Sequence, residues 1–146
     1  MIAHAVALAV LLLPTVSLAQ PRAFSCVGAE QLEDGVFAIP FGRGAAVPAE
    51  AARSNLEAAA ALAKREPARS ICVLGHAGRQ EGGAQTGLQL AARRAGAVAE
   101  ALAKLGVGRD RIRAEARRAA FTRAALPLER SVTVVVLPRE NSEPLP

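Results

Sequence analysis

The sequence has very few aromatic residues and no long block of like charge. Of its 146 residues four are Phe, and both Trp and Tyr are absent. Sugar rings and single-stranded bases are generally held against aromatic faces, so this composition argues against a glycan-stacking site and against nucleic acid as a partner. The formal net charge of +5 leaves two interpretations open: an arginine-rich solvated surface, or an anionic partner.

Residues that commonly carry catalysis or bind metals are scarce as well. The chain contains two His, and one of them, His4, lies in the apolar N-terminal segment. Cysteine and histidine never occur together at the spacing of a metal site, and no Ser/His/Asp or Cys/His set is suggested. We therefore predict a protein that is not an enzyme and needs no metal and no cofactor. An enzyme is the least favoured alternative.

The N-terminal segment, residues 1–19, has the pattern of a secretory signal. An apolar run from Ala5 to Leu13 is followed by Pro14 and by small residues at Ser17 and Ala19, which suit a cleavage site. A membrane span needs about 20 apolar residues, and this stretch is shorter. Cleavage after Ala19 would export the mature chain with no transmembrane span. An uncleaved anchor helix is the alternative.

The chain has two cysteines, Cys26 and Cys72, and both lie beyond the signal segment. In an oxidising compartment such a pair is expected to form a disulfide. Closing the long loop between them would stabilise the fold by about 4 kcal/mol in the chain-entropy model. Two buried free thiols are the alternative.

Hydrophobic patterns predict alternating strands and helices in the mature chain. Pro40 indicates an edge strand or a bulge, Pro48 suits the first position of a helix, and Gly106 suits a helix C-terminus. Strands are expected at Gly35–Phe41, Ser70–Ala77, Ile112–Arg117 and Arg130–Pro138, and helices at Pro48–Arg65 and Leu88–Leu105. The order β-α-β-α-β-β predicts an α/β two-layer sandwich, with two helices on one face of a mixed four-stranded sheet.

Four segments, in this order, resemble the OmpA-like C-terminal domain family. They are "GVFAIPFGRGAAVPAEAARSNLEAAAALAK", "ICVLGHAG", "LQLAARRAGAVAEALAKLGVGRDRI" and "ERSVTVVV". The third is the most specific, because it is similar to the family signature Leu-Ser-x-x-Arg-Ala-x-x-Val…Leu…Gly-Val…Arg-Ile. The resemblance places the domain at residues 36–138, after an irregular segment at 20–35 and before a flexible tail at 139–146. It implies a periplasmic module that holds outer-membrane proteins and flagellar stators to peptidoglycan.

The same resemblance implies a ligand site. In the family, the Asp of a Gly-His-Thr-Asp motif pairs with the ammonium of diaminopimelate in the peptidoglycan stem peptide, and the Arg of an Arg-Ala motif pairs with its carboxylate. Carried over, Arg94 takes the carboxylate role, Ala77 and Gly78 form the loop, and Arg130 begins the closing strand. Gly78 stands where the Asp is expected. Glu81, the only loop carboxylate, could replace it by folding inward; a solvated glutamate at the loop tip is the alternative.

Other charged residues near the loop have less specific interpretations. At about 100° per residue, Arg94 lies about 60° from the buried Ala91 and flanks the apolar stripe, where its alternative role is to cover apolar surface with its stem. Arg93 points to solvent. His76 is either part of the loop site or a hydrogen-bonded structural histidine. The remaining arginines, Arg79, Arg118 and Arg123, either form a basic rim near the loop or are ordinary surface residues.

Two functions follow. The first is an exported cell-envelope protein that binds the peptidoglycan stem peptide non-covalently or anchors the envelope. The second is a degenerate domain that has lost this ligand and serves as a structural or protein-interaction module beside other envelope proteins. The missing Asp at Gly78 is the feature that separates them.

Overall fold

The computed structural model describes residues 23–78, 81, 86–118 and 130–139. The predicted signal segment, Arg79, Arg123 and residues 140–146 lie outside this part of the chain. The elements are the 3₁₀ turns η1 (Ala29–Gln31), η2 (Glu50–Ala52) and η3 (Arg109–Arg111), the helices α1 (Arg53–Arg65) and α2 (Gly87–Lys104), and the strands β1 (Val36–Pro40), β2 (Ile71–Gly75), β3 (Ile112–Ala116) and β4 (Ser131–Val136). Within the described ranges, no helix is both long and apolar enough to cross a membrane.

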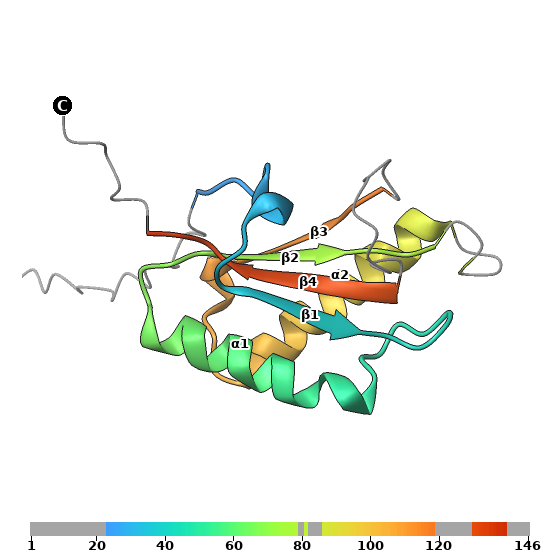
Figure 1. The fold of residues 1–146 in the computed structure, drawn as a ribbon, viewed down its shortest axis with the longest axis horizontal. Coiled ribbons are helices and arrows are strands. Elements are labelled where there is room, and N and C mark those ends of the chain that lie inside the picture. The colour runs from blue at the N-terminus through green and yellow to red at the C-terminus, as the bar shows by residue number, and fades with distance from the viewer. Residues whose placement is uncertain (1–22, 79–80, 82–85, 119–129, 140–146) are drawn as a thin grey trace, which may run out of the picture.

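The four strands form one mixed sheet in the order β1-β4-β2-β3. Strand β4 runs antiparallel to both neighbours, and β2 and β3 are parallel. Both helices lie on the same side of this sheet (Figure 1). The predicted fold class is therefore confirmed, and Pro40 lies in an edge strand as its missing N–H requires.

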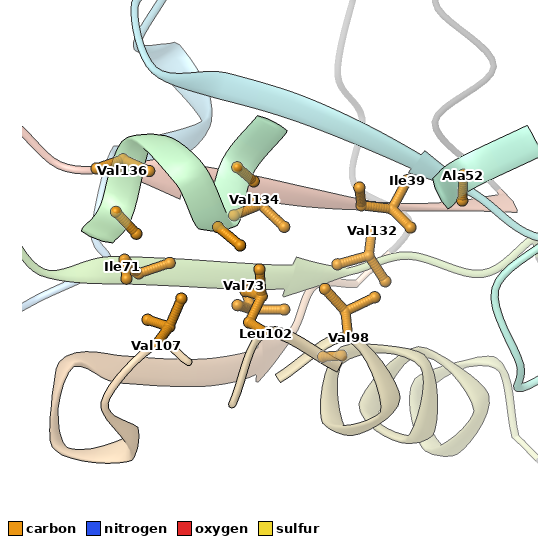
Figure 2. Close-up of a cluster of buried hydrophobic side chains, with 14 of the residues drawn as sticks. Ile39, Ala52, Ile71, Val73, Val98, Leu102, Val107, Val132, Val134 and Val136 are labelled. Carbon is orange, nitrogen blue, oxygen red and sulfur yellow. The ribbon is translucent and has the colours of Figure 1, made fainter. Parts of the chain in front are cut away.

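The main core fills the space between the sheet and the two helices. Alternate residues of β1, β2 and β4 face the helices, and small alanines on the helices let the backbones come close to the sheet (Figure 2). The fully buried members from the strands are Ile39, Ile71, Val73, Val132, Val134 and Val136, and those from α2 include Val98 and Leu102. Burying each of the larger side chains contributes about 1.5–3 kcal/mol, so this layer holds the fold together.

The opposite face of the sheet is covered in part by the N-terminal segment that starts at residue 23 (Figure 1). Cys26 and Cys72 form the predicted disulfide, with their Cα atoms 5.7 Å apart. Leu74 and Val135 pack against this segment from the sheet. Strands β2 and β4 are consequently buried on both faces, which explains why their sequences are continuous apolar runs rather than alternating ones.

The first helix begins later than the sequence predicts. Pro48 forms an isolated β-bridge with Phe41 instead of starting the helix. The N–H of Ala49 donates to the carbonyl of Pro40 at 3.0 Å, so the chain stays extended alongside the end of β1. The short turn η2 then leads into α1, and the expected role of Pro48 at the first helical position is wrong because pairing with the strand holds the backbone in an extended conformation.

Helix α2 begins and ends with well-defined caps. Thr86 accepts a hydrogen bond from the N–H of Gln89, whose side chain in turn accepts from the N–H of Thr86. At the other end Gly106 has a φ of 99°. The N–H groups of Gly106 and Val107 donate to the carbonyls of Ala103 and Leu102, which is the Schellman arrangement. The predicted glycine cap is thus confirmed.

The contact between β2 and α2 is tightest at Gly75. A Cβ atom built on Gly75 would lie 2.0 Å from the carbonyl oxygen of Ala91. Any residue other than glycine would therefore clash with the backbone of α2 and force it to move. The glycine therefore allows the end of β2 to lie directly on the first turns of α2. This close approach brings the segment after β2 over the side chain of Arg94.

Candidate functional site

The residues implicated in ligand binding gather at one end of the sheet. Gly75, the last residue of β2, pairs with Val132 near the start of β4, and Pro40, the last residue of β1, pairs with Ser131. The loops that leave β1 and β2 therefore meet here, above the first half of α2. The register alone brings three segments that are distant in the sequence to a single site.

Arg94 is the centre of this site, and its side chain is fully buried. Its Nε donates to the carbonyl of Ala45 at 2.8 Å, Nη1 to the carbonyl of His76 at 3.0 Å and Nη2 to the carbonyl of Gly42 at 3.2 Å. The guanidinium also lies over the ring of Phe41, with Cζ 5.3 Å from the ring centroid. The expectation that Arg94 flanks the core is wrong, because carbonyls from both loops satisfy the guanidinium inside the protein.

Glu81 folds inward and places its carboxylate against Arg94. Oε1 accepts from Arg94 Nη1 at 3.1 Å and from the N–H of Gly78 at 3.0 Å. Oε2 accepts from Arg94 Nη2 at 2.7 Å and from the N–H of Gly44 at 2.8 Å. The side chain of Glu81 is only 5% exposed, so the alternative of a solvated loop-tip glutamate is wrong.

The electrostatics of the pair follow from these contacts. The hydrogen bonds from Arg94 and, to a smaller extent, those from the N–H groups of Gly44 and Gly78 together lower the pKa of Glu81 to about 2, against the opposing effect of burial. The carboxylate is therefore ionised at neutral pH. Two parallel N–H···O bonds between a guanidinium and a carboxylate are among the strongest polar contacts in proteins, and a site shielded from water strengthens them.

The other predicted site residues have different surroundings. Gly78 supplies a backbone N–H to the carboxylate, as described. Ala77 is buried against Leu90 and Ala91, and its methyl side chain has no polar group to offer a ligand. Arg130 is half-exposed, and its Nε lies 3.9 Å from Oε2 of Glu81. The structure thus brings Arg94, Glu81, Gly78 and Arg130 together, while their role toward a ligand stays a prediction.

His76 adopts a structural arrangement. Its Nε2 lies 3.3 Å from the hydroxyl oxygen of Thr133, and its backbone N–H donates to the carbonyl of Ser131. Burial lowers the pKa of His76, with a smaller contribution from the charge of Arg117. The imidazole is therefore neutral at physiological pH, and the contribution of this residue to the site is its backbone carbonyl.

Exposed arginines surround the buried pair. Arg43 belongs to the loop after β1, Arg118 follows β3, and Arg130 precedes β4; all three are exposed. Among the residues that the structure describes, Arg43 and Arg118 form no ion pair, whereas Arg130 approaches Glu81. Arg93 is exposed on α2, as predicted. Among the residues that the structure describes, this end of the domain therefore presents three exposed arginines around the buried pair.

Sequence reasoning missed the partners that the loop after β1 supplies. Gly42 and Ala45 hold Arg94 through their carbonyls, and Gly44 holds Glu81 through its N–H. All three contacts use backbone atoms, which leave no trace in residue type. The available signal was the glycine-rich turn "FGRGAA" directly after a predicted strand. In the described ranges, no group of three or more His, Cys, Asp or Glu residues could hold a metal ion.

Comparison with known proteins agrees with this geometry. The model of the OmpA family matches residues 41–131. The OmpA-like domain of FopA1 from Francisella tularensis subsp. tularensis SCHU S4 is 20% identical, with a TM-score of 0.57 over 73% of this chain and 75% of that one. The peptidoglycan-associated lipoprotein from Burkholderia pseudomallei is 21% identical, with a TM-score of 0.54 over 69% of this chain and 88% of that one. The periplasmic domain of Helicobacter pylori MotB (residues 90–256) is 17% identical, with a TM-score of 0.55 over 68% of this chain and 70% of that one. No curated protein matches the sequence. At these identities the solved structures establish a common fold.

Proposed function

Because this chain belongs to the OmpA family, we propose that it is an exported cell-envelope protein that associates non-covalently with peptidoglycan. The contact is made at the loop end of the sheet, by a site centred on Arg94 that recognises a carboxylate of the stem peptide. A solved structure with the same fold carries the name peptidoglycan-associated lipoprotein, which agrees with this assignment.

The observation that supports the proposal is the way in which the site holds a carboxylate. The side chain of Glu81 receives four hydrogen bonds there: two from Arg94 and one each from the N–H groups of Gly44 and Gly78. A planar guanidinium with two converging N–H groups is suited to a carboxylate or a phosphate, and in this site the group that it holds is a carboxylate. The geometry is therefore that of a carboxylate receptor, whichever molecule supplies the carboxylate.

The surface around the site favours an anionic polymer. Arg43, Arg118 and Arg130 are exposed and attract carboxylates over roughly the Debye length, about 8–10 Å at physiological salt. Gly78 offers no side chain to pair with an ammonium group. We therefore expect binding that is weaker and more sensitive to salt than binding by a site with one fixed charge of each sign.

A second function is favoured because the buried pair of Arg94 and Glu81 already satisfies the hydrogen-bonding groups of the guanidinium. Every N–H of the Arg94 guanidinium has a partner inside the protein, and the side chain is fully buried. A domain in this state serves the envelope as a structural or protein-interaction module with no peptidoglycan ligand.

Co-sedimentation with purified sacculi separates the two functions. The chain is expected to pellet with sacculi at low salt and to be released as salt is added. Replacing Arg43, Arg118 and Arg130 together by Ala should reduce the bound fraction. Replacing the exposed Arg53, Arg65 and Arg93 together by Ala is the matched control, because it removes three positive charges elsewhere. If the chain stays in the supernatant at low salt, and Arg94→Ala changes nothing, the structural module is the correct function.

A further inference from the structure

The buried pair has no capacity left for a second carboxylate. The guanidinium of Arg94 has five N–H groups, and three donate to carbonyls while two donate to Glu81. Each oxygen of Glu81 accepts two hydrogen bonds. An external carboxylate therefore cannot join the pair from outside, and it can reach Arg94 only in place of Glu81.

Glu81 is attached to the site by a very short tether. It lies three residues after Gly78, and the N–H of Glu81 donates to the carbonyl of Gly78 at 3.2 Å, closing a turn. A tethered group competes with a free one at an effective concentration in the millimolar range or above. An external ligand then shows an apparent dissociation constant equal to its intrinsic value divided by the fraction of molecules in which Glu81 is out of the site, so its binding is weakened.

The groups that hold the carboxylate belong to the rest of the domain and stay when Glu81 leaves. The N–H of Gly44 comes from the loop after β1, Arg94 from α2, and Arg130 reaches the rim from the start of β4. The carbonyls of Gly42, Ala45 and His76 keep the guanidinium in place. Removal of Glu81 thus leaves an ordered anion pocket rather than a collapsed core.

We infer that the Arg94 site is a carboxylate-binding pocket whose resident ligand is Glu81 of the same chain, and that an external carboxylate enters by displacing this side chain. The inference rests on the proposed function only where it identifies the external carboxylate as that of peptidoglycan. Because the pKa of Glu81 is about 2, protonation does not release it near neutral pH, and competition by the ligand itself is the route of opening.

Chemical rescue of Glu81→Ala by sodium acetate tests the inference. The variant leaves Arg94 buried without its carboxylate and should unfold at a lower temperature than the unaltered chain. Acetate should restore the melting temperature along a saturable curve, beyond the effect of equal concentrations of sodium chloride. The unaltered chain and the exposed-carboxylate control Glu50→Ala should show only the general salt effect. An equal response of all three proteins to acetate would overturn the inference.

Glu81→Gln covers the case in which Glu81→Ala does not fold, because it keeps the volume of the side chain. The measurement is an acetate titration followed through the backbone amide signals of Gly44 and Gly78 in NMR spectra. Saturable shifts are expected in Glu81→Gln at lower acetate concentrations than in the unaltered chain, where acetate must first displace Glu81. Saturation at the same concentration in both proteins, or saturation in neither, would contradict the idea of a resident carboxylate.

Sacculi then distinguish this inference from the proposed function. If the minor open state is populated at about 10% or less, removing Glu81 should tighten binding to sacculi by about tenfold or more. Acetate rescue without sacculus binding by any variant would leave the resident carboxylate standing and refute the peptidoglycan function. Sacculus binding that is equally tight with and without Glu81 would leave the function standing and refute the resident carboxylate.

Discussion

Two buried arginines lie at opposite ends of the sheet, and they are held in different ways. Arg111, next to the start of β3, donates to the carbonyls of Ala63, Glu66 and Arg69 where α1 ends. Arg94, at the loop end, donates to carbonyls as well but also to the carboxylate of Glu81. Both side chains are buried, so burial alone does not reveal which of them is a site.

The two arginines differ in whether a partner of the guanidinium can leave the site. The carbonyls around Arg111 are fixed in the backbone at the C-terminus of a helix, where the helix dipole also favours a cation. The carboxylate beside Arg94 is a side-chain group on a loop, and another carboxylate can replace it. Arg111 is therefore a clamp between α1 and β3, whereas Arg94 is half of an exchangeable pair. Four measurements test this comparison.

Replacing Arg94 by Met should have the largest effect. It leaves the charge of Glu81 buried without its partner, a loss of about 3–5 kcal/mol in the free energy of unfolding. Urea unfolding measures this change, and the exposed neighbour Arg93→Met is the control. The double variant Arg94→Met with Glu81→Met should recover much of the loss. A cost for Arg94→Met as small as that for Arg93→Met would show that the pair contributes nothing.

Lowering the pH should remove the contribution of Glu81. The pKa of Glu81 falls from 4.5 to about 2 on folding, so its stabilisation is present above pH 4.5 and is lost as the pH falls toward 2. The shift corresponds to about 3 kcal/mol. The difference in unfolding free energy between the unaltered chain and Glu81→Gln should shrink across this window. A constant difference from pH 5 to pH 2 would exclude the assignment.

Replacing Arg111 by Met should cost less than replacing Arg94. It leaves the carbonyls of Ala63, Glu66 and Arg69 without this donor, and the expected loss is about 1–3 kcal/mol. Urea unfolding gives the value, and added acetate should not change it. If Arg111→Met is as costly as Arg94→Met, the distinction between a clamp and a pair does not hold.

The smallest effect is expected at the exposed pair Arg109–Glu100. Both side chains are more than half exposed. Surface ion pairs of this kind contribute about 0–1 kcal/mol. Arg109→Met, in the same turn η3 as Arg111, should therefore leave urea unfolding nearly unchanged. A loss comparable to that of Arg111→Met would mean that the whole turn, and not the buried guanidinium, holds α1.

The fold could be predicted from the sequence because its signals are local. The spacing of apolar residues in α2, the β-branched run in β4 and the glycine at position 106 each act within a few residues, and the structure confirms the elements that they predict. The start of α1 could not be predicted in this way. Its position depends on the pairing of Pro48 with Phe41, which forms only when the sheet edge is in place.

The site was harder to predict because its contacts are not local. A helical wheel places Arg94 beside the apolar stripe, at the surface. The wheel contains only the residues of one helix, so it gives no information on carbonyls elsewhere in the chain that could accept hydrogen bonds from a buried guanidinium. In Arg94 those carbonyls come from Gly42 and Ala45, about fifty residues away. The inward position of Glu81 likewise depends on the N–H of Gly44. Residue types identified the members of the pair, but only the fold shows that they satisfy each other.

The disulfide between Cys26 and Cys72 determines how this domain carries a mechanical load. Tension applied upstream of Cys26 passes through the S–S bond directly into β2, an interior strand held by hydrogen bonds to both β4 and β3. Residues 27–71, which include β1 and α1, form a closed loop outside that shortest path. A protein of the cell envelope that is pulled from its N-terminal side would therefore transmit the force to the centre of its sheet before any of its edge elements is peeled away.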